Sequence, residues 1–160
     1  MTGEINNTAT FVNEDGYIQL DAWTPPSVGD ISFLFRTPYA KGIILHNGEI
    51  TREYVRVHII NNQTLRLEFN LGFGTKKLDV KVKSSSDTLN DRKWHKVSLW
   101  HNQKEFVLKL DDVKAEEKLP VHLSTQLNAD GKLNIGGYSR DQLNGFVGCI
   151  KGLVCIVQKQ

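Results

Sequence analysis

Apolar and polar residues alternate with a period of two along most of this 160-residue chain. Successive side chains of an extended strand point to opposite faces of a sheet, so this period predicts strands with one face in a core. No window of about 12 residues carries the i, i+3, i+4, i+7 pattern of an amphipathic helix, and the chain is expected to be all-β. The alternating apolar positions are Ile31, Phe33 and Phe35; Val55, Val57 and Ile59; Leu65, Leu67 and Phe69; Val80 and Val82; Val97 and Leu99; and Phe106, Leu108 and Leu110.

Short polar turns separate these segments. The turn at Asn102-Gln103-Lys104 is expected to pair Val97 and Leu99 with the strand that follows it. Many short strands punctuated in this way indicate two packed antiparallel sheets. The segment from Lys114 to Lys118 is compatible with a helical turn, although five residues cannot sustain a helix alone. The other turn signals are Asp15-Gly16, Pro25-Pro26, Asn47-Gly48, Asn61-Asn62, Asp111-Asp112, Asp130-Gly131 and Asn144-Gly145.

Length and charge restrict the class of protein. A chain of 160 residues fits one domain that can bury its own core. Twenty basic and eighteen acidic residues give a net charge of +2, which is too balanced for a general nucleic-acid binder. No apolar run approaches the roughly 18 residues of a membrane span, so no direct membrane insertion is expected. We expect one domain over residues 1–160, with its core at about 10–157.

Several segments, in their order and spacing, resemble the laminin G-like family, whose members are also called LNS domains. They are similar to the domains of neurexins and of contactin-associated (Caspr-type) adhesion proteins. The resemblance implies a two-sheet antiparallel jelly-roll sandwich of the laminin G-like or concanavalin A-like type. The alternation and the turn spacing predict which side chains its core buries: Phe33, Phe35, Val57, Phe69, Trp94, Leu108 and Ile135. The segments are LNIGGYSRDQLNGFVGCIKGL at Leu133 to Leu153, NDRKWHKVSLW at Asn90 to Trp100, GDISFLFRT at Gly29 to Thr37, KGIILHNG at Lys41 to Gly48 and YVRVHI at Tyr54 to Ile59.

The resemblance implies a non-catalytic extracellular module for cell adhesion or for synaptic or matrix organisation. Such a module, part of a secreted or single-pass membrane protein, engages an extracellular or cell-surface protein through rim loops or a sheet face. The alternative is carbohydrate recognition, of a sulfated glycosaminoglycan or of the lectin type, and Trp23 and Trp100 exposed side by side would favour it. Glycoside hydrolysis needs a carboxylate pair in a groove. Glu49 and Glu53 have an i, i+4 spacing but no aromatic platform nearby, so a solvated loop is the preferred interpretation.

The resemblance also implies a Ca²⁺ site at the sandwich rim. Matching positions place a carboxylate on Glu53, a backbone carbonyl on Leu71, and a second carbonyl and a side-chain oxygen on Gln126 and Asn128. All four are oxygen donors, which a hard cation requires. Relatives usually carry Asp at the position of Glu53, and the extra methylene favours a weak or vestigial site with a Kd of about 10⁻⁴–10⁻³ M. The alternative is a polar loop in which Asn128 and Asp130 merely form a turn.

Basic and modifiable side chains suggest further surface sites. Lysines at four nearby positions could attract a sulfated glycan, as in similar domains of laminin and agrin-like proteins, or could protect a sheet edge. Asn6 and Asn62 each begin an N-x-[ST] glycosylation motif, and Asn62 falls in an expected exposed turn. The four lysines are Lys76, Lys77, Lys81 and Lys83.

Two cysteines flank the strand-like segment 150–154. Six extended steps of about 3.3 Å separate their Cα atoms by roughly 20 Å, whereas a disulfide tolerates roughly 4.4–6.8 Å. Cys149 and Cys155 are therefore not expected to bond to each other. In similar domains the cysteine after Gly148 usually bonds a downstream partner; two buried thiols are the alternative. The five histidines show no metal-ligand spacing and are expected to be structural.

Overall fold

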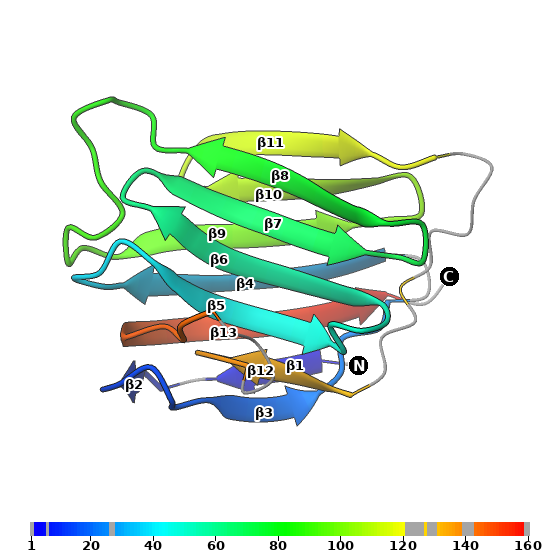
Figure 1. Cartoon of the computed structure of the whole chain (residues 1–160), viewed down its shortest axis with the longest axis horizontal. Coiled ribbons are helices and arrows are strands. Elements are labelled where there is room, and N and C mark those ends of the chain that lie inside the picture. Colours follow the sequence, from blue (N-terminus) through cyan, green and yellow to red (C-terminus); the bar gives the residue numbers. More distant parts are fainter. Residues whose placement is uncertain are drawn as a thin grey trace.

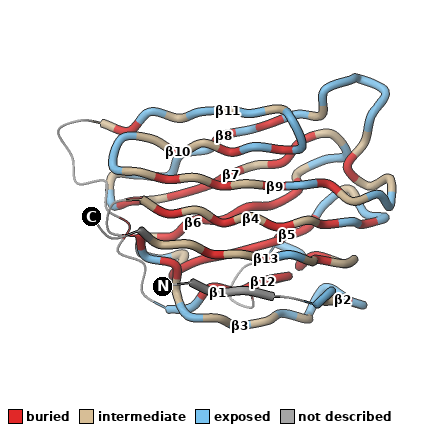
Figure 2. Tube along the Cα trace, turned by 180° about the vertical axis from the view of Figure 1, so that it is seen from behind, coloured by how far each residue is buried: buried red, intermediate tan, exposed pale blue. Residues whose placement is uncertain are grey.

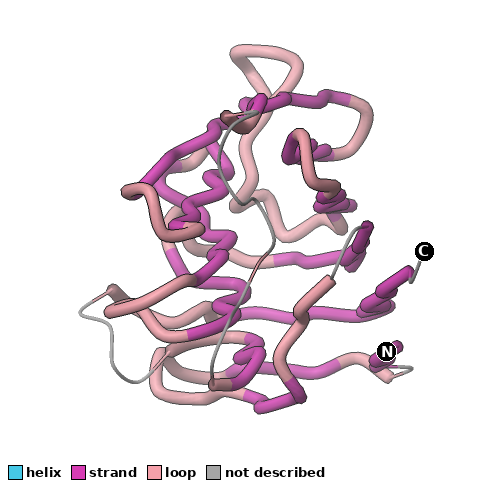
Figure 3. The backbone as a smooth tube through the Cα atoms, turned by 90° about the vertical axis from the view of Figure 1, so that its right-hand side faces the viewer, coloured by secondary structure: helices cyan, strands magenta, loops and turns pink. Residues whose placement is uncertain are grey.

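The computed structural model describes residues 2–5, 7–25, 28–120, 127, 131–138 and 143–158. Within these residues the regular structure is entirely strand, with no helical segment (Figure 3). The all-β prediction is confirmed. The strands are β1 Thr2–Ile5, β2 Ala9–Phe11, β3 Ile18–Asp21, β4 Val28–Arg36, β5 Gly42–Gly48, β6 Tyr54–Asn61, β7 Thr64–Asn70, β8 Thr75–Lys81, β9 His95–His101, β10 Glu105–Leu110, β11 Val113–Lys118, β12 Lys132–Ile135 and β13 Gly148–Gln158.

The strands form two antiparallel sheets that lie one over the other (Figure 1). The first sheet has the order β1-β13-β4-β9-β10-β11, and β2 also pairs with β13. The second sheet has the order β3-β12-β5-β6-β7-β8. Successive strands β4 and β5 belong to different sheets, so the chain crosses the sandwich there. This arrangement is the jelly-roll sandwich that the resemblance implied.

Inward-facing side chains of both sheets make one core. In β4 the odd positions Ile31, Phe33 and Phe35 are buried and the positions between them are half-buried, an alternation that Figure 2 shows along the strands. Across the core, the ring centroids of Phe69 and Phe106 lie 4.4 Å apart. The other predicted apolar faces also turn inward, with Val82 only partly buried. The prediction from the period of two is thus confirmed strand by strand.

The turn before β10 pairs the strands as predicted, with Leu99 opposite Leu108 and Val97 opposite Leu110. The segment 114–118, which is compatible with a helical turn by sequence, is instead part of strand β11 and is paired along its length with β10. Inter-strand hydrogen bonds outweigh the weak helix preference of five residues.

Trp94 was expected in the core, and this prediction was wrong. The next residue, His95, begins β9 facing inward, with its ring 5.4 Å from that of Phe35. Side chains alternate along an extended chain, so Trp94 falls outside the core and is half-buried. There its ring lies 4.8 Å from the guanidinium of Arg36 and 4.1 Å from the ammonium of Lys151. These cation–π contacts replace the expected core packing.

Both cysteines lie on β13 as free thiols, so the prediction that they do not bond to each other is confirmed. Strand β13 stays paired with β4 on both sides of a bulge between Lys151 and Val154, which keeps the two thiols apart. Cys155 is buried in the core, and burial raises the pKa of its thiol to about 11. The Sγ of half-buried Cys149 lies 3.6 Å from the Oγ1 of Thr10.

Candidate functional site

Two of the four predicted calcium ligands, Glu53 and Leu71, lie at the end of the sandwich where β5 stops. Glu53 lies between β5 and β6, and Leu71 directly follows β7. The Oε1 of Glu53 is 3.3 Å from the place that a Cβ would occupy on Gly72, so this carboxylate lies over the turn that contains the Leu71 carbonyl. The structure therefore places the Glu53 carboxylate next to the Leu71–Gly72 turn. Gln126 and Asn128 lie outside the described residues.

The four predicted glycan-binding lysines, Lys76, Lys77, Lys81 and Lys83, are all exposed on or just after β8. Strand β8 is an edge of its sheet. Lys83 pairs with Asp112 at 3.3 Å, and Asp79 on the same strand is held by Arg66. The cluster thus contains acidic as well as basic groups, as a protected strand edge commonly does.

The remaining sequence-based sites have distinct surroundings. Asn62 is exposed in the turn between β6 and β7, and Asn6 lies outside the described residues. The hydroxyl of Tyr138 donates to Glu49 at 3.2 Å, and the Arg52 amide donates to the Glu49 carbonyl at 2.9 Å, which closes a turn. Glu49 is therefore engaged in structural contacts.

The tryptophans form no exposed pair. Trp23 is only 1% exposed; its amide donates to Asn47 Oδ1 at 2.7 Å and its indole Nε1 donates to the Ile156 carbonyl at 3.2 Å. Trp100 is half-buried on β9 of the first sheet. The aromatic arrangement that would have favoured sugar binding is therefore not formed by these two residues.

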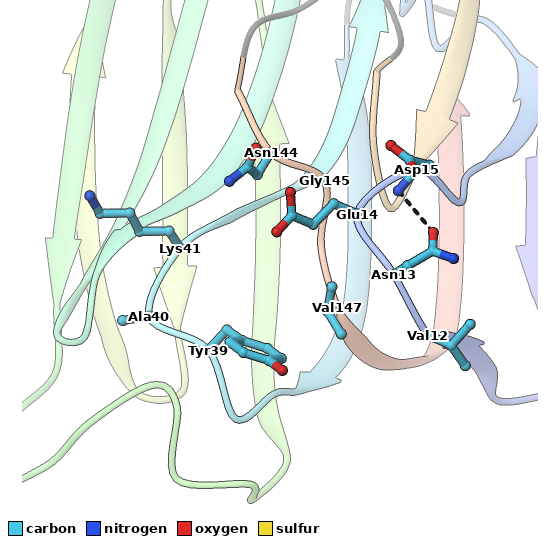
Figure 4. Close-up of a pocket in the computed structure, with 10 residues that line it drawn as sticks. All are labelled: Val12, Asn13, Glu14, Asp15, Tyr39, Ala40, Lys41, Asn144, Gly145 and Val147. Carbon is cyan, nitrogen blue, oxygen red and sulfur yellow. Dashed lines mark hydrogen bonds between the residues drawn. The ribbon is translucent and has the colours of Figure 1, made fainter.

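A cavity of 630 Å³ opens at the other end of the sandwich, where β5 begins (Figure 4). We call it the end groove. The loop after β2, the loop between β4 and β5, and the segment that leads into β13 surround it. Two of its apolar side chains are well exposed, Val12 at 81% and Tyr39 at 56%. The lining residues are Val12, Asn13, Glu14, Asp15, Tyr39, Ala40, Lys41, Asn144, Gly145 and Val147.

Backbone contacts hold the floor of the end groove in place. The Ile43 amide donates to the Asn144 carbonyl at 3.0 Å, next to a parallel bridge between Ile43 and Gly145. A Cβ on Gly145 would lie 2.3 Å from the Glu14 carbonyl oxygen, so only glycine allows the two loops this close approach. The Thr37 hydroxyl donates to the Val147 carbonyl at 2.6 Å, which links the loop between β4 and β5 to the segment before β13. The groove is thus preformed by segments far apart in sequence.

A buried polar cluster covers part of the outer face of the second sheet. His46 on β5, Arg56 on β6 and Glu68 on β7 stand opposite one another in the strand register, and all three are at most 8% exposed. Arg56 pairs with Glu68, whose Oε2 also accepts a hydrogen bond from the Tyr54 hydroxyl at 2.9 Å. The ring of His46 stacks between Tyr54 at 5.5 Å and Tyr138 at 3.8 Å, measured between centroids. Tyr138, from the segment after β12, therefore shields this cluster.

Burial of this cluster shifts the pKa values of its ionisable side chains. Burial, with a contribution from the positive charge of Arg56, lowers the pKa of His46 to about 3 and that of His58 to about 4. Burial alone would raise the pKa of Glu68, but hydrogen bonding and charge from Arg56 outweigh it and lower that pKa. Both histidines are therefore neutral near neutral pH, while the Glu68 carboxyl is ionised. Sequence reasoning missed this cluster because polar positions on an alternating strand indicate a solvent-facing side.

Comparisons with known proteins agree with this architecture. The Laminin G domain profile matches residues 35–156. Neurexin-4 of Drosophila melanogaster is 31% identical over 150 residues, which are 93% of this chain and 11% of that protein. The chain thus spans a small part of that relative.

The fold is shared by solved structures, among them the following two. Domains LG4-5 of the mouse laminin α1 chain superpose with a TM-score of 0.77 at 20% identity, over 94% of this chain and 41% of that one. The CBM40 of Ruminococcus gnavus IT-sialidase, bound to α2,6 sialyllactose, superposes with a TM-score of 0.71 at 16% identity, over 100% of this chain and 94% of that one. Because the family profile covers most of the chain and the sandwich is that of a laminin domain, this chain belongs to the laminin G domain family.

Proposed function

We propose that this domain is an extracellular, non-catalytic binding module that engages a protein partner through the end groove. The observation that carries the proposal is a preformed cavity of 630 Å³ beside two exposed apolar side chains, Val12 and Tyr39. Exposed apolar groups next to a rigid hollow are typical of interaction sites. Glu14, Asp15 and Lys41 add the charged rim that gives such a site its specificity.

Family membership supports this proposal at the level of class. Laminin G domains and their neurexin relatives generally serve as extracellular adhesion or binding modules. In the described residues, the carboxylates nearest to a hydrolase-like spacing, Glu49 and Glu53, lie away from the end groove, at the opposite end of β5. The end groove therefore does not contain these two carboxylates, and we propose it as a surface for recognition.

The test is binding of the tagged domain to cultured cells. We expect Val12→Ser and Tyr39→Ser each to weaken binding about tenfold, because central apolar contacts carry most of the energy of an interface. Tyr17→Ser is the matched control, since Tyr17 is 45% exposed but does not line the groove. Trypsin treatment of the cells should abolish binding. Equal binding by the Val12 and Tyr39 variants and the wild type would exclude the end groove as the site.

We further propose that Ca²⁺ modulates the opposite rim, held by Glu53, the Leu71 carbonyl, Gln126 and Asn128. The nearness of the Glu53 carboxylate to the Leu71–Gly72 turn supports this assignment. Glu53 supplies the only formal negative charge of the four, so the position of its carboxylate controls metal attraction. In calorimetry Glu53→Asp should tighten binding and Asn128→Ala should abolish it. No Ca²⁺-dependent heat from the wild type at about millimolar metal would indicate a vestigial site and metal-independent partner binding.

The second candidate function is carbohydrate recognition. It is favoured by the superposition of the whole chain on nearly all of a carbohydrate-binding module bound to sialyllactose, and by the exposed lysines of β8. The same cell assay separates the candidates. Heparinase or sialidase treatment of the cells should abolish binding if a glycan is recognised and should leave it intact if a protein is recognised. Competition by heparin would point to a sulfated glycosaminoglycan and the lysines Lys76, Lys77, Lys81 and Lys83.

A further inference from the structure

A second cavity, of 410 Å³, lies beside the end groove and shares Lys41 and Asn144 with it. We call it the side cavity. We propose that it binds an acidic sugar through the sugar's carboxylate. This inference rests on the second candidate function, carbohydrate recognition, and its test uses free sugars, so that it does not require protein binding at the end groove. The lining residues are Lys41, Gly42, Ile43, His58, Ile59, Ile60, Arg66, Leu143 and Asn144.

The charged groups of the side cavity can bind one carboxylate group of a ligand. Lys41 and Arg66 line it, and no acidic residue does so among the residues that the structure describes. Arg66 donates from Nε to Asp79 Oδ1 at 2.8 Å and from Nη2 to Asp79 Oδ2 at 3.0 Å. This pairing fixes the guanidinium and uses two of its five N–H groups, so others are left to donate. Asp79 balances the charge of Arg66, and Lys41 supplies one net positive charge.

His58 provides the polar contact that points to a hydroxylated ligand. The residue is only 8% exposed, and its Nε2 has no hydrogen-bond partner in the described part of the chain. A buried polar atom without a partner is costly, so the site gains when a ligand satisfies it. Burial lowers the pKa of His58 to about 4, and a neutral imidazole has one donor and one acceptor nitrogen, as a hydroxyl group requires.

Apolar side chains complete the site. Leu143, which lines the cavity, is 46% exposed, and Ile60, which also lines it, is half-buried. An apolar wall beside polar groups matches the two kinds of surface of a sugar ring, its C–H face and its hydroxyl edge. The cavity volume falls within the range typical of small-ligand sites. Together these features favour a ring that carries a carboxylate over a bare anion.

The test is a titration of the ¹⁵N-labelled domain, followed by amide chemical shifts, with methyl β-glucuronide and methyl β-glucoside. The two sugars differ only at the carboxylate carbon. We expect the glucuronide to shift the amides of Gly42 and His58 and to bind at least about fivefold more tightly than the glucoside, because one opposite charge is gained. Lys41→Gln should remove that difference. His58→Phe should weaken both sugars. Lys109→Gln is the control that should change neither, since Lys109 is an exposed lysine on β10 that does not line the side cavity.

Three results would overturn the proposal in distinguishable ways. If the glucuronide shifts the amides around Lys77 and Lys81 and Lys81→Gln weakens it, the β8 edge binds acidic sugars; carbohydrate recognition then stands and the side cavity fails. If neither sugar, nor heparin, nor sialyllactose perturbs any amide, the side-cavity proposal and carbohydrate recognition are both excluded. If N-acetyl-aspartate methylamide shifts the amides of Gly42 and His58 and binds with the same dissociation constant as the glucuronide, the cavity recognises a carboxylate without the sugar. Thermal unfolding of each variant confirms that it is folded.

Discussion

The two buried histidines of the second sheet should make this domain lose stability in mild acid. His46 is 0% exposed and His58 8% exposed, and their pKa values are lowered to about 3 and about 4 from an ordinary value of 6.5. Between about pH 6 and pH 5 the unfolded chain holds most of a proton on each imidazole, whereas the folded chain leaves both imidazoles neutral. The histidine contribution is therefore complete above about pH 6.5 and is lost as the pH falls toward the folded pKa values.

The expected loss follows from the linkage relation. Each histidine contributes at most about 1.4 kcal/mol per pH unit, and its unfolded form is already about three-quarters protonated at pH 6. The two histidines together should therefore lower the free energy of unfolding by about 2–3 kcal/mol between pH 6 and pH 5. That is a large part of the roughly 5–15 kcal/mol that stabilises a typical domain. The lowered pKa values of Glu68 and Asp79 act mainly at more acidic pH, because their ordinary values are 4.5 and 3.8. The pKa of His95 is raised by Asp111 and Asp91 against the effect of burial, so its contribution is present below its ordinary pKa and adds little to the loss.

Urea unfolding of the wild type and matched variants at these two pH values measures the effect. His46→Phe keeps a ring between Tyr54 and Tyr138 and removes the titrating nitrogen. His58→Gln keeps a polar group on β6. Each variant should show about half of the wild-type change in unfolding free energy, while His95→Gln should retain all of it. A wild-type change below about 0.5 kcal/mol, or an equal change in all three variants, would refute the reasoning.

Three further predictions concern the core, the thiols and the turn after β6. Phe69→Ala should lower the unfolding free energy by about 3–5 kcal/mol, since the ring is fully buried against Phe106; a loss below about 1 kcal/mol in urea unfolding would argue against this packing. Cys149 should react with a thiol reagent in the folded domain and Cys155 should react only on unfolding, because Cys155 is buried with a raised pKa; equal rates by mass spectrometry would contradict this. Asn62→Gln should remove one glycan from the domain expressed through a secretory pathway, and an unchanged mass after this substitution would show that the exposed turn is not modified.

Much of the fold could be predicted from local sequence because side-chain direction in a strand is a local property. The alternation at Ile31, Phe33 and Phe35 placed the inward face of β4, and the corresponding patterns placed those of β6, β7, β9 and β10. A period of two is enough to distinguish inward from outward positions. The order of the family-like segments then indicated how the strands join into a sandwich.

Other features depended on strand boundaries and partners. By sequence Trp94 was expected in the core. In the structure β9 begins at the inward-facing His95, so the side chain before it points outward. Residues 114–118 became a strand because β10 lies beside them. The alternation along β6 marked Arg56 and His58 as outward-facing but could not tell that this outer face would be buried.

The sequence by itself determined the class of fold, the inward faces and the separation of the two cysteines, since each follows from extended backbone geometry over a few residues. Only the tertiary structure decided where the candidate sites lie. The end groove needs Val12, Tyr39 and Gly145, and the side cavity needs Lys41, His58 and Arg66, brought together from different strands and loops. Their meeting depends on how the two sheets close and how the loops pack, and no local pattern encodes a contact between segments so far apart in the chain.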